Sequence, residues 1–91
     1  MESKNAMVEH QLDNQRIVVT RDICHGKPRL AGTRIMVYQV LDLLAGGKSI
    51  DEIRSDDYFP ELTVEDIFAC LRYASQVIRA EEIIPVYEHF A

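Results

Sequence analysis

The sequence predicts a small, mainly α-helical domain of three helices with a β element near its N-terminal end. Residues 36–45 and 64–80 place apolar side chains three and four positions apart, which is the spacing of one helix face. Residues 16–20, RIVVT, are β-branched and bounded by charged side chains, which is typical of a strand. A chain of 91 residues is long enough for one domain around a single core.

The chain divides into an arm, a folded domain and a tail. Residues 1–15 are polar and lack a sustained apolar period, so we expect a flexible arm. We expect residues 16–80 to form the trihelical domain with an N-terminal β hairpin. Residues 81–91 form an apolar tail that either packs on the helices or meets another surface. Its large apolar side chains are Ile83, Ile84, Val86, Tyr87 and Phe90.

Glycines and capping residues set the limits of the first two expected helices. The first begins at Met36 and ends at the glycine pair 46–47, because glycine favours a helix C-terminus. Ser49 with Glu52 three residues later is a capping box, which predicts a short second helix over 50–56.

The third helix is the longest, and Thr63 with Asp66 caps it. Three helices with a short middle one resemble a helix-turn-helix, a unit that serves many purposes besides DNA binding. An apolar stripe runs along the third helix, and we expect it to be buried. Its members are Ile67, Leu71, Ala74 and Ile78, with Val64, Phe68 and Cys70 beside it.

Charge is unevenly distributed along the chain. The net charge of -5 disfavours indiscriminate nucleic-acid binding, which needs Lys and Arg to neutralise phosphates. Residues 16–34 nevertheless hold five basic residues and one acidic residue, which gives them a charge of +4. Residues 35–91 hold four basic and eleven acidic residues, a charge of -7. A small basic element attached to an acidic body indicates a charged partner.

The positive charge gathers in a glycine-containing loop, HGKPRLAGTRI, over 25–35. The residues expected to shape it are Gly26, Pro28 and Gly32. The candidate contacts to an anionic protein or nucleic acid are Arg21, Lys27, Arg29, Thr33 and Arg34. The alternative is that the charges only solvate the turn and that the threonine hydroxyl only bonds the local backbone.

The sequence favours a binding protein over an enzyme. Cys24 and His25 are adjacent, but neighbours on an extended strand point to opposite faces and would not form a nucleophile–base pair. The His and Cys residues lack the paired spacing of a metal site, and the GxxxxGK[ST] phosphate loop is missing. We therefore expect no catalytic residue, metal or cofactor. The unpaired cysteines and the lack of a secretory or membrane-spanning run favour a cytoplasmic protein.

The start of the third helix is acidic, which disfavours ordinary reading of a DNA groove. In a helix-turn-helix the second helix of the unit presents its N-terminal residues to the bases. Here Glu61 precedes that helix, and Glu65 and Asp66 lie in its first turn, where they would repel phosphates. The basic side chains of the preceding hairpin region, Lys27, Arg29 and Arg34 with Arg21, are therefore the better candidates for a DNA contact.

Two segments, GKPRLAGTRIMVYQVLDLLAGGKSIDEI and YFPELTVEDIFACLRYA, resemble domain-of-unknown-function family 433 over about residues 16–74. The pattern of that family runs GGKPxIxGTRIxV, then LLAxGxSxEEI, then YPxLTxEDIxAAL. This chain departs from it twice. His25 stands at the first glycine, and Phe59 is inserted before Pro60.

The resemblance implies a winged-helix or homeodomain-like trihelical domain that acts as the antitoxin of a toxin–antitoxin pair. Its usual partner is a small PIN-like ribonuclease, which holds Mg²⁺ with carboxylates. Arg29 or Arg34 would then take the place of the cation, and the apolar tail would add contact area. We also expect a homodimer, through the hairpin or the tail, and operator DNA is left open as a second ligand. The alternative is a DNA-binding transcriptional regulator without a toxin partner.

Overall fold

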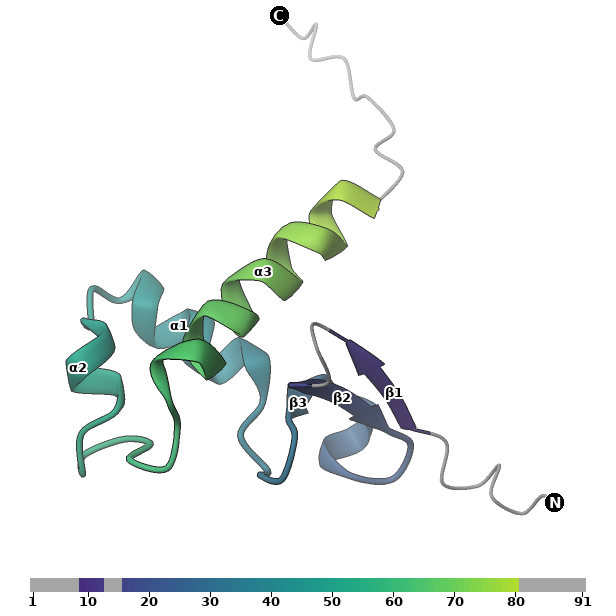
Figure 1. The fold of residues 1–91 in the computed structure, drawn as a ribbon, viewed down its shortest axis with the longest axis horizontal. Coiled ribbons are helices and arrows are strands. Elements are labelled where there is room, and N and C mark those ends of the chain that lie inside the picture. Colours follow the sequence, from purple (N-terminus) through teal and green to yellow (C-terminus); the bar gives the residue numbers. More distant parts are fainter. Residues whose placement is uncertain (1–8, 13–15, 81–91) are drawn as a thin grey trace, which may run out of the picture.

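The computed structural model describes residues 9–12 and 16–80 (Figure 1). Within these ranges a small sheet precedes three α-helices, so the predicted mainly α class with an N-terminal β element is confirmed. The elements are β1 (Glu9–Leu12), β2 (Ile17–Thr20), β3 (Arg29–Leu30), α1 (Val37–Ala45), α2 (Ile50–Ile53) and α3 (Val64–Ala80). None of the helices in this part of the chain has the length and apolar character needed to cross a membrane.

The sheet is antiparallel, and its strands lie in the order β1-β2-β3. The expected hairpin is formed by β2 and β3, with Ile17 opposite Leu30. The prediction of a flexible arm over 1–15 is wrong for Glu9–Leu12, which pairs along the whole of β2. Three of its four residues are polar, and they form a strand because its hydrogen bonds come from the backbone, which apolar periodicity does not report. The apolar tail, 81–91, lies outside the described residues.

The predicted caps form the helix ends. In α2 the Ser49 backbone N–H donates to Glu52 Oε1 (2.7 Å), and the Glu52 N–H donates to Ser49 Oγ (3.1 Å). Thr63 and Asp66 exchange the same pair of bonds at the start of α3 (2.9 and 3.1 Å). The second helix is shorter than predicted and ends at Ile53, because the carbonyl of Ile53 accepts the N–H of Phe59 (2.9 Å).

One apolar core joins the sheet to the helices. The side chains of Ile17 on β2, Val40 on α1, Ile53 on α2 and Ile67 on α3 are all fully buried in it. Arg16 adds a polar link, since its guanidinium pairs with Asp66 Oδ1 (3.0 Å) and so ties the start of β2 to α3. In Figure 1, α3 crosses in front of α1, and its C-terminal half stands out from the rest of the fold.

The stripe predicted to be buried on α3 is only partly buried. Ile67 is fully buried and Ala74 is half-buried, but Leu71 is 44% exposed and Ile78 is 61% exposed. Cys70, predicted to lie beside the stripe, is fully buried. The prediction fails at two of the four positions because the apolar surface of α3 is wider than the face that packs on the core.

Candidate partner-binding site

The loop between β2 and α1 is built on a left-handed turn. Cys24, His25 and Gly26 adopt positive φ in succession, at 55°, 58° and 73°. The N–H of Lys27 closes the turn on the carbonyl of Cys24 (3.0 Å). Positive φ costs a residue with a side chain more than it costs glycine, so the protein holds Cys24 and His25 in a less favourable conformation.

The turn explains why glycine is common at position 25 in the pattern that this sequence resembles. His25 lies at a φ that glycine adopts without a steric cost. The turn also corrects the prediction that Cys24 and His25 lie on an extended strand. The Cys24 thiol donates to the carbonyl of Arg34 (3.6 Å), while the His25 side chain is exposed.

Arg29 lies inside the loop, where it is 6% exposed. Its guanidinium donates to Thr20 Oγ1 (2.8 Å) and to the carbonyl of Thr33 (3.2 Å). These bonds hold β3 against the end of β2 and against the turn that follows. Arg29 therefore stabilises the loop, and the prediction that it contacts a partner does not fit this placement.

Thr33 also has a structural role. Its hydroxyl donates to the carbonyl of Leu30 (2.8 Å) and accepts the N–H of Ile35 (2.9 Å). These local bonds are the alternative that the sequence left open. Gly32, at φ 80°, supplies the positive φ of the same turn.

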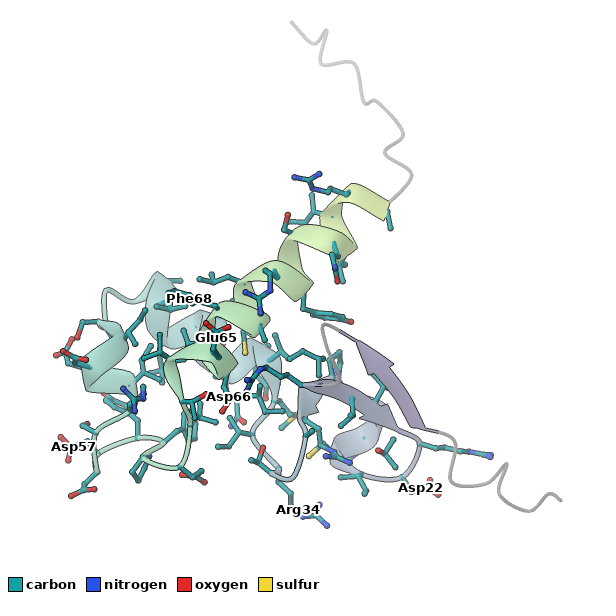
Figure 2. The ribbon with its side chains drawn as sticks, in the orientation of Figure 1. Asp22, Arg34, Asp57, Glu65, Asp66 and Phe68 are labelled. Carbon is teal, nitrogen blue, oxygen red and sulfur yellow. The ribbon has the colours of Figure 1, made fainter. Side chains whose placement is uncertain are left out.

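We call residues 21–34 the basic loop. Three of the predicted cationic contacts on it are exposed, namely Arg21, Lys27 and Arg34. In Figure 2 the Arg34 side chain extends from the loop away from the helices. Asp22 is the sole acidic residue of 16–34. The loop thus presents cations on a backbone that Arg29 and Thr33 hold in place.

An apolar groove of about 340 Å³ lies beside the basic loop, between α1 and the C-terminal half of α3. Tyr38, Val77 and Ile78 are 49%, 39% and 61% exposed, so much of its apolar surface is open. Lys27 and Pro28 border it at the loop. Besides Lys27 and Pro28, the groove is lined by Val37, Tyr38 and Leu41 from α1 and by Tyr73, Ala74, Val77 and Ile78 from α3. A cation beside an apolar groove suits a protein partner that carries both acidic and apolar groups.

The sequence analysis missed this groove. The apolar spacing of α1 identifies the side that packs on the core. Tyr38 lies outside that side, and nothing in the sequence predicts that it lines a groove with residues of α3. The groove arises because α1 and α3 meet at an angle, which neither helix specifies alone.

The opposite charge gathers around α2 and its connection to α3. Exposed acidic residues there are Asp51, Glu52, Asp56, Asp57 and Glu61. Figure 2 places Asp57 at the far end of the molecule from Asp22 of the basic loop. Hydrogen bonds from the backbone N–H and then the hydroxyl of Ser49 hold the pKa of Glu52 below its usual value of 4.5.

The start of α3 is occupied by structural bonds and by negative charge. Asp66 both caps the helix and pairs with Arg16. Glu65 is exposed and lies 3.7 Å from Arg72. Both acids suit the positive end of the helix dipole and disfavour contact with phosphates. The described residues hold no group of three or more His, Cys, Asp or Glu side chains suited to a metal ion.

A comparison with protein-family models gives one match, over residues 17–74. This range contains β2, the basic loop, α1, α2 and most of α3. The family model described as a protein of unknown function (DUF433) matches this range, which is well over half of the chain. No curated protein and no solved structure is significantly similar to the chain. The chain therefore belongs to the DUF433 family.

Proposed function

We propose that this protein is an antitoxin-like binding protein that neutralises a small PIN-like ribonuclease in the cytoplasm, acting as a homodimer. The observation that carries the proposal is the exposed Arg34 on a loop whose shape Arg29 and Thr33 maintain. A side chain on an ordered backbone loses less entropy on binding, and a guanidinium pairs bidentately with carboxylates. Arg34 would occupy the place of Mg²⁺ among the carboxylates of the nuclease.

The surroundings of Arg34 support a protein ligand. Lys27 adds an exposed cation at the edge of the groove between α1 and α3, where a partner could bury apolar side chains. The exposed acids around α2 would attract the basic RNA-binding rim of a nuclease during encounter. The predicted contribution of the tail, from Ile83 to Phe90, stays a prediction because the tail lies outside the described residues.

The test is a titration of this protein against a small PIN-like ribonuclease from the adjoining reading frame of its genome, if that frame encodes one, by calorimetry and by residual ribonuclease activity. Removal of one member of a buried charge pair costs about 2 kcal/mol or more, so Arg34→Ala should weaken binding at least about 30-fold. Lys48→Ala removes a cation between α1 and α2, away from the basic loop, and is the matched control. Equal affinities for the two variants would contradict the assigned role of Arg34.

A DNA-binding regulator is the second candidate, favoured by the +4 charge of residues 16–34 on a three-helix domain. Such a protein should shift DNA from upstream of its own gene, and its affinity should fall steeply with salt. The double variant Lys27→Ala/Arg34→Ala should abolish the shift. DNA binding without any binding to the nuclease would favour this candidate over the antitoxin.

A further inference from the structure

The outer face of α3 carries apolar side chains with a seven-residue repeat. Val64, Leu71 and Ile78 are 37%, 44% and 61% exposed, and Phe68, four residues after Val64, is 39% exposed. A helix that packs along another helix carries apolar side chains alternately three and four positions apart. Positions 64, 68, 71, 75 and 78 have this spacing, and all but Ser75 are large and apolar. The core takes the other side of α3, at Ile67 and Cys70. We call Val64, Phe68, Leu71 and Ile78 the outer face of α3. Ile78 also lines the groove between α1 and α3, so the outer face and the groove meet at this residue.

A charged residue follows each apolar residue of the repeat. The order is Glu65, Arg72 and Arg79, so the acid lies near the start of the helix and the bases lie toward its end. In two parallel copies these charges would lie on opposite flanks of the contact, where none of them meets another of the three. Two antiparallel copies centred on Leu71 would instead place Glu65 near Arg79 of the second copy at both ends of the contact, and the two Arg72 side chains near each other at its centre. The two contacts of opposite charge outnumber the one contact of like charge. The charge pattern therefore favours an antiparallel second copy as the occupant of this face.

The same register matches the apolar residues. With Leu71 at the centre, Val64 lies beside Ile78 of the second copy, and the two Leu71 side chains meet. The C-terminal half of α3 stands out from the rest of the described fold in Figure 1, and Leu71 and Ile78 are exposed among the described residues. Figure 2 shows Phe68 and Glu65 on the near side of the helix.

The existing contacts of these charges are weak enough to rearrange. Glu65 lies 3.7 Å from Arg72, and both side chains are about half exposed. Arg79 Nε donates to Ser75 Oγ at 3.3 Å on the surface. Exposed pairs of this kind contribute little to stability, so exchanging them for contacts across an interface costs little.

We propose that the outer face of α3 is the homodimer interface, formed by two antiparallel helices around a two-fold axis at Leu71. The interface is isologous, as closed dimers require. It specifies the homodimer of the proposed function and places it on a surface other than the hairpin or the tail. The test of this interface does not depend on the identity of the nuclease, because dimerisation is measured on this protein alone.

The first test is sedimentation equilibrium of the full chain. The wild type should be a concentration-dependent dimer. Leu71→Glu places two carboxylates against each other on the axis and should weaken dimerisation at least about 100-fold. Gln76→Glu adds the same charge to an exposed position of the same helix outside the outer face, and it should leave dimerisation unchanged. A monomeric wild type, or a Leu71→Glu variant that dimerises like the wild type, would overturn the proposal.

The second test examines the direction of the helices. Glu65→Arg alone and Arg79→Glu alone each create two like-charge contacts in an antiparallel dimer, and each should weaken it about tenfold. The double variant Glu65→Arg/Arg79→Glu restores opposite charges and should recover the wild-type dissociation constant within about twofold. In a parallel dimer the single variants would change nothing, which would refute the antiparallel arrangement.

Titration with the nuclease separates this inference from the proposed function. Leu71→Glu should bind the nuclease through Arg34 as a monomer, whereas Arg34→Ala should dimerise normally and fail to bind it. A dimer lost without loss of nuclease binding supports two separate surfaces. Loss of both activities in Leu71→Glu, with circular dichroism unchanged, would place the nuclease on α3 and overturn the separation.

Discussion

The β-loop region (16–36) and the helical region (37–80) share one apolar core, but their backbones are held in place by different kinds of contact. The helical region depends on apolar packing around Ile53 and Ile67, and its ends are closed by local caps. In the β-loop region, Arg29 and Thr33 hold the backbone with hydrogen bonds from their side chains. The comparison teaches that residue type and spacing identify most roles in the helices, whereas in the loop the direction of each side chain decides its role.

The largest effect is expected inside the helical region. Ile67→Ala leaves a cavity at a fully buried site and should lower the free energy of unfolding by about 3 kcal/mol. Leu71→Ala, on the outer face of the same helix, should lower it by less than about 1 kcal/mol. Urea unfolding followed by circular dichroism, at concentrations where the protein is monomeric, measures both. Equal losses would mean that the two faces of α3 are not as different as their exposure indicates.

The corresponding contrast in the β-loop region is between two arginines. Arg29→Ala removes the buried bonds to Thr20 and Thr33 and should cost about 2 kcal/mol. Arg34→Ala should change the free energy of unfolding by no more than about 0.5 kcal/mol, since Arg34 is exposed. The same urea experiment compares the two variants. A stable Arg29→Ala protein would show that the loop does not need its internal hydrogen bonds.

A smaller effect, of the opposite sign, is expected in the left-handed turn. His25→Gly removes the steric cost of a side chain at φ 58° and should raise the free energy of unfolding by up to about 1 kcal/mol. His25→Val places a β-branched residue at the same φ and should lower it by about 1 kcal/mol. Thermal unfolding of the two variants beside the wild type provides the measurement. A glycine variant less stable than the valine variant would contradict the strain assigned to the turn.

The smallest effect concerns the cap of α2. The pKa of Glu52 is lower in the folded protein than its usual value of 4.5, so its contribution to stability is fully present above 4.5. That contribution is lost as the pH falls through the folded pKa. Glu52→Gln keeps an oxygen that accepts the Ser49 N–H but cannot titrate, so the stability of the variant should fall less steeply than that of the wild type as the pH drops below about 4.5. Identical pH profiles for the variant and the wild type would contradict this role for the carboxylate.

The sequence predicted the helices well because their signals are local. The pairs Ser49–Glu52 and Thr63–Asp66 lie three residues apart, so the bonds that start α2 and α3 could be inferred directly. The strand Glu9–Leu12 could not be inferred from the sequence, because it lacks an alternating apolar pattern. It pairs with β2 through backbone hydrogen bonds. The acidic start of α3 was also predicted correctly, with Glu65 exposed and Asp66 in a cap.

The candidate site was predicted in outline and corrected in detail. The sequence located the positive charge in 16–34, but it could not separate Arg29, which faces inward, from Arg34, which faces out. Both are arginines five positions apart in a segment without a regular period. Only the pairing of β3 with β2 places the Arg29 guanidinium beside Thr20.

The sequence by itself determined the family, the three helices, their caps and the place of the basic loop, because these depend on residue type and short-range spacing. The tertiary structure decided which arginine is available to a partner, where the groove lies and which apolar side of α3 is covered. These features depend on how close distant segments come to each other. The apolar pattern of α3 predicts that the helix packs against other elements. In the described part of the chain, β2 and α1 cover one side of α3 and leave Leu71 and Ile78 exposed.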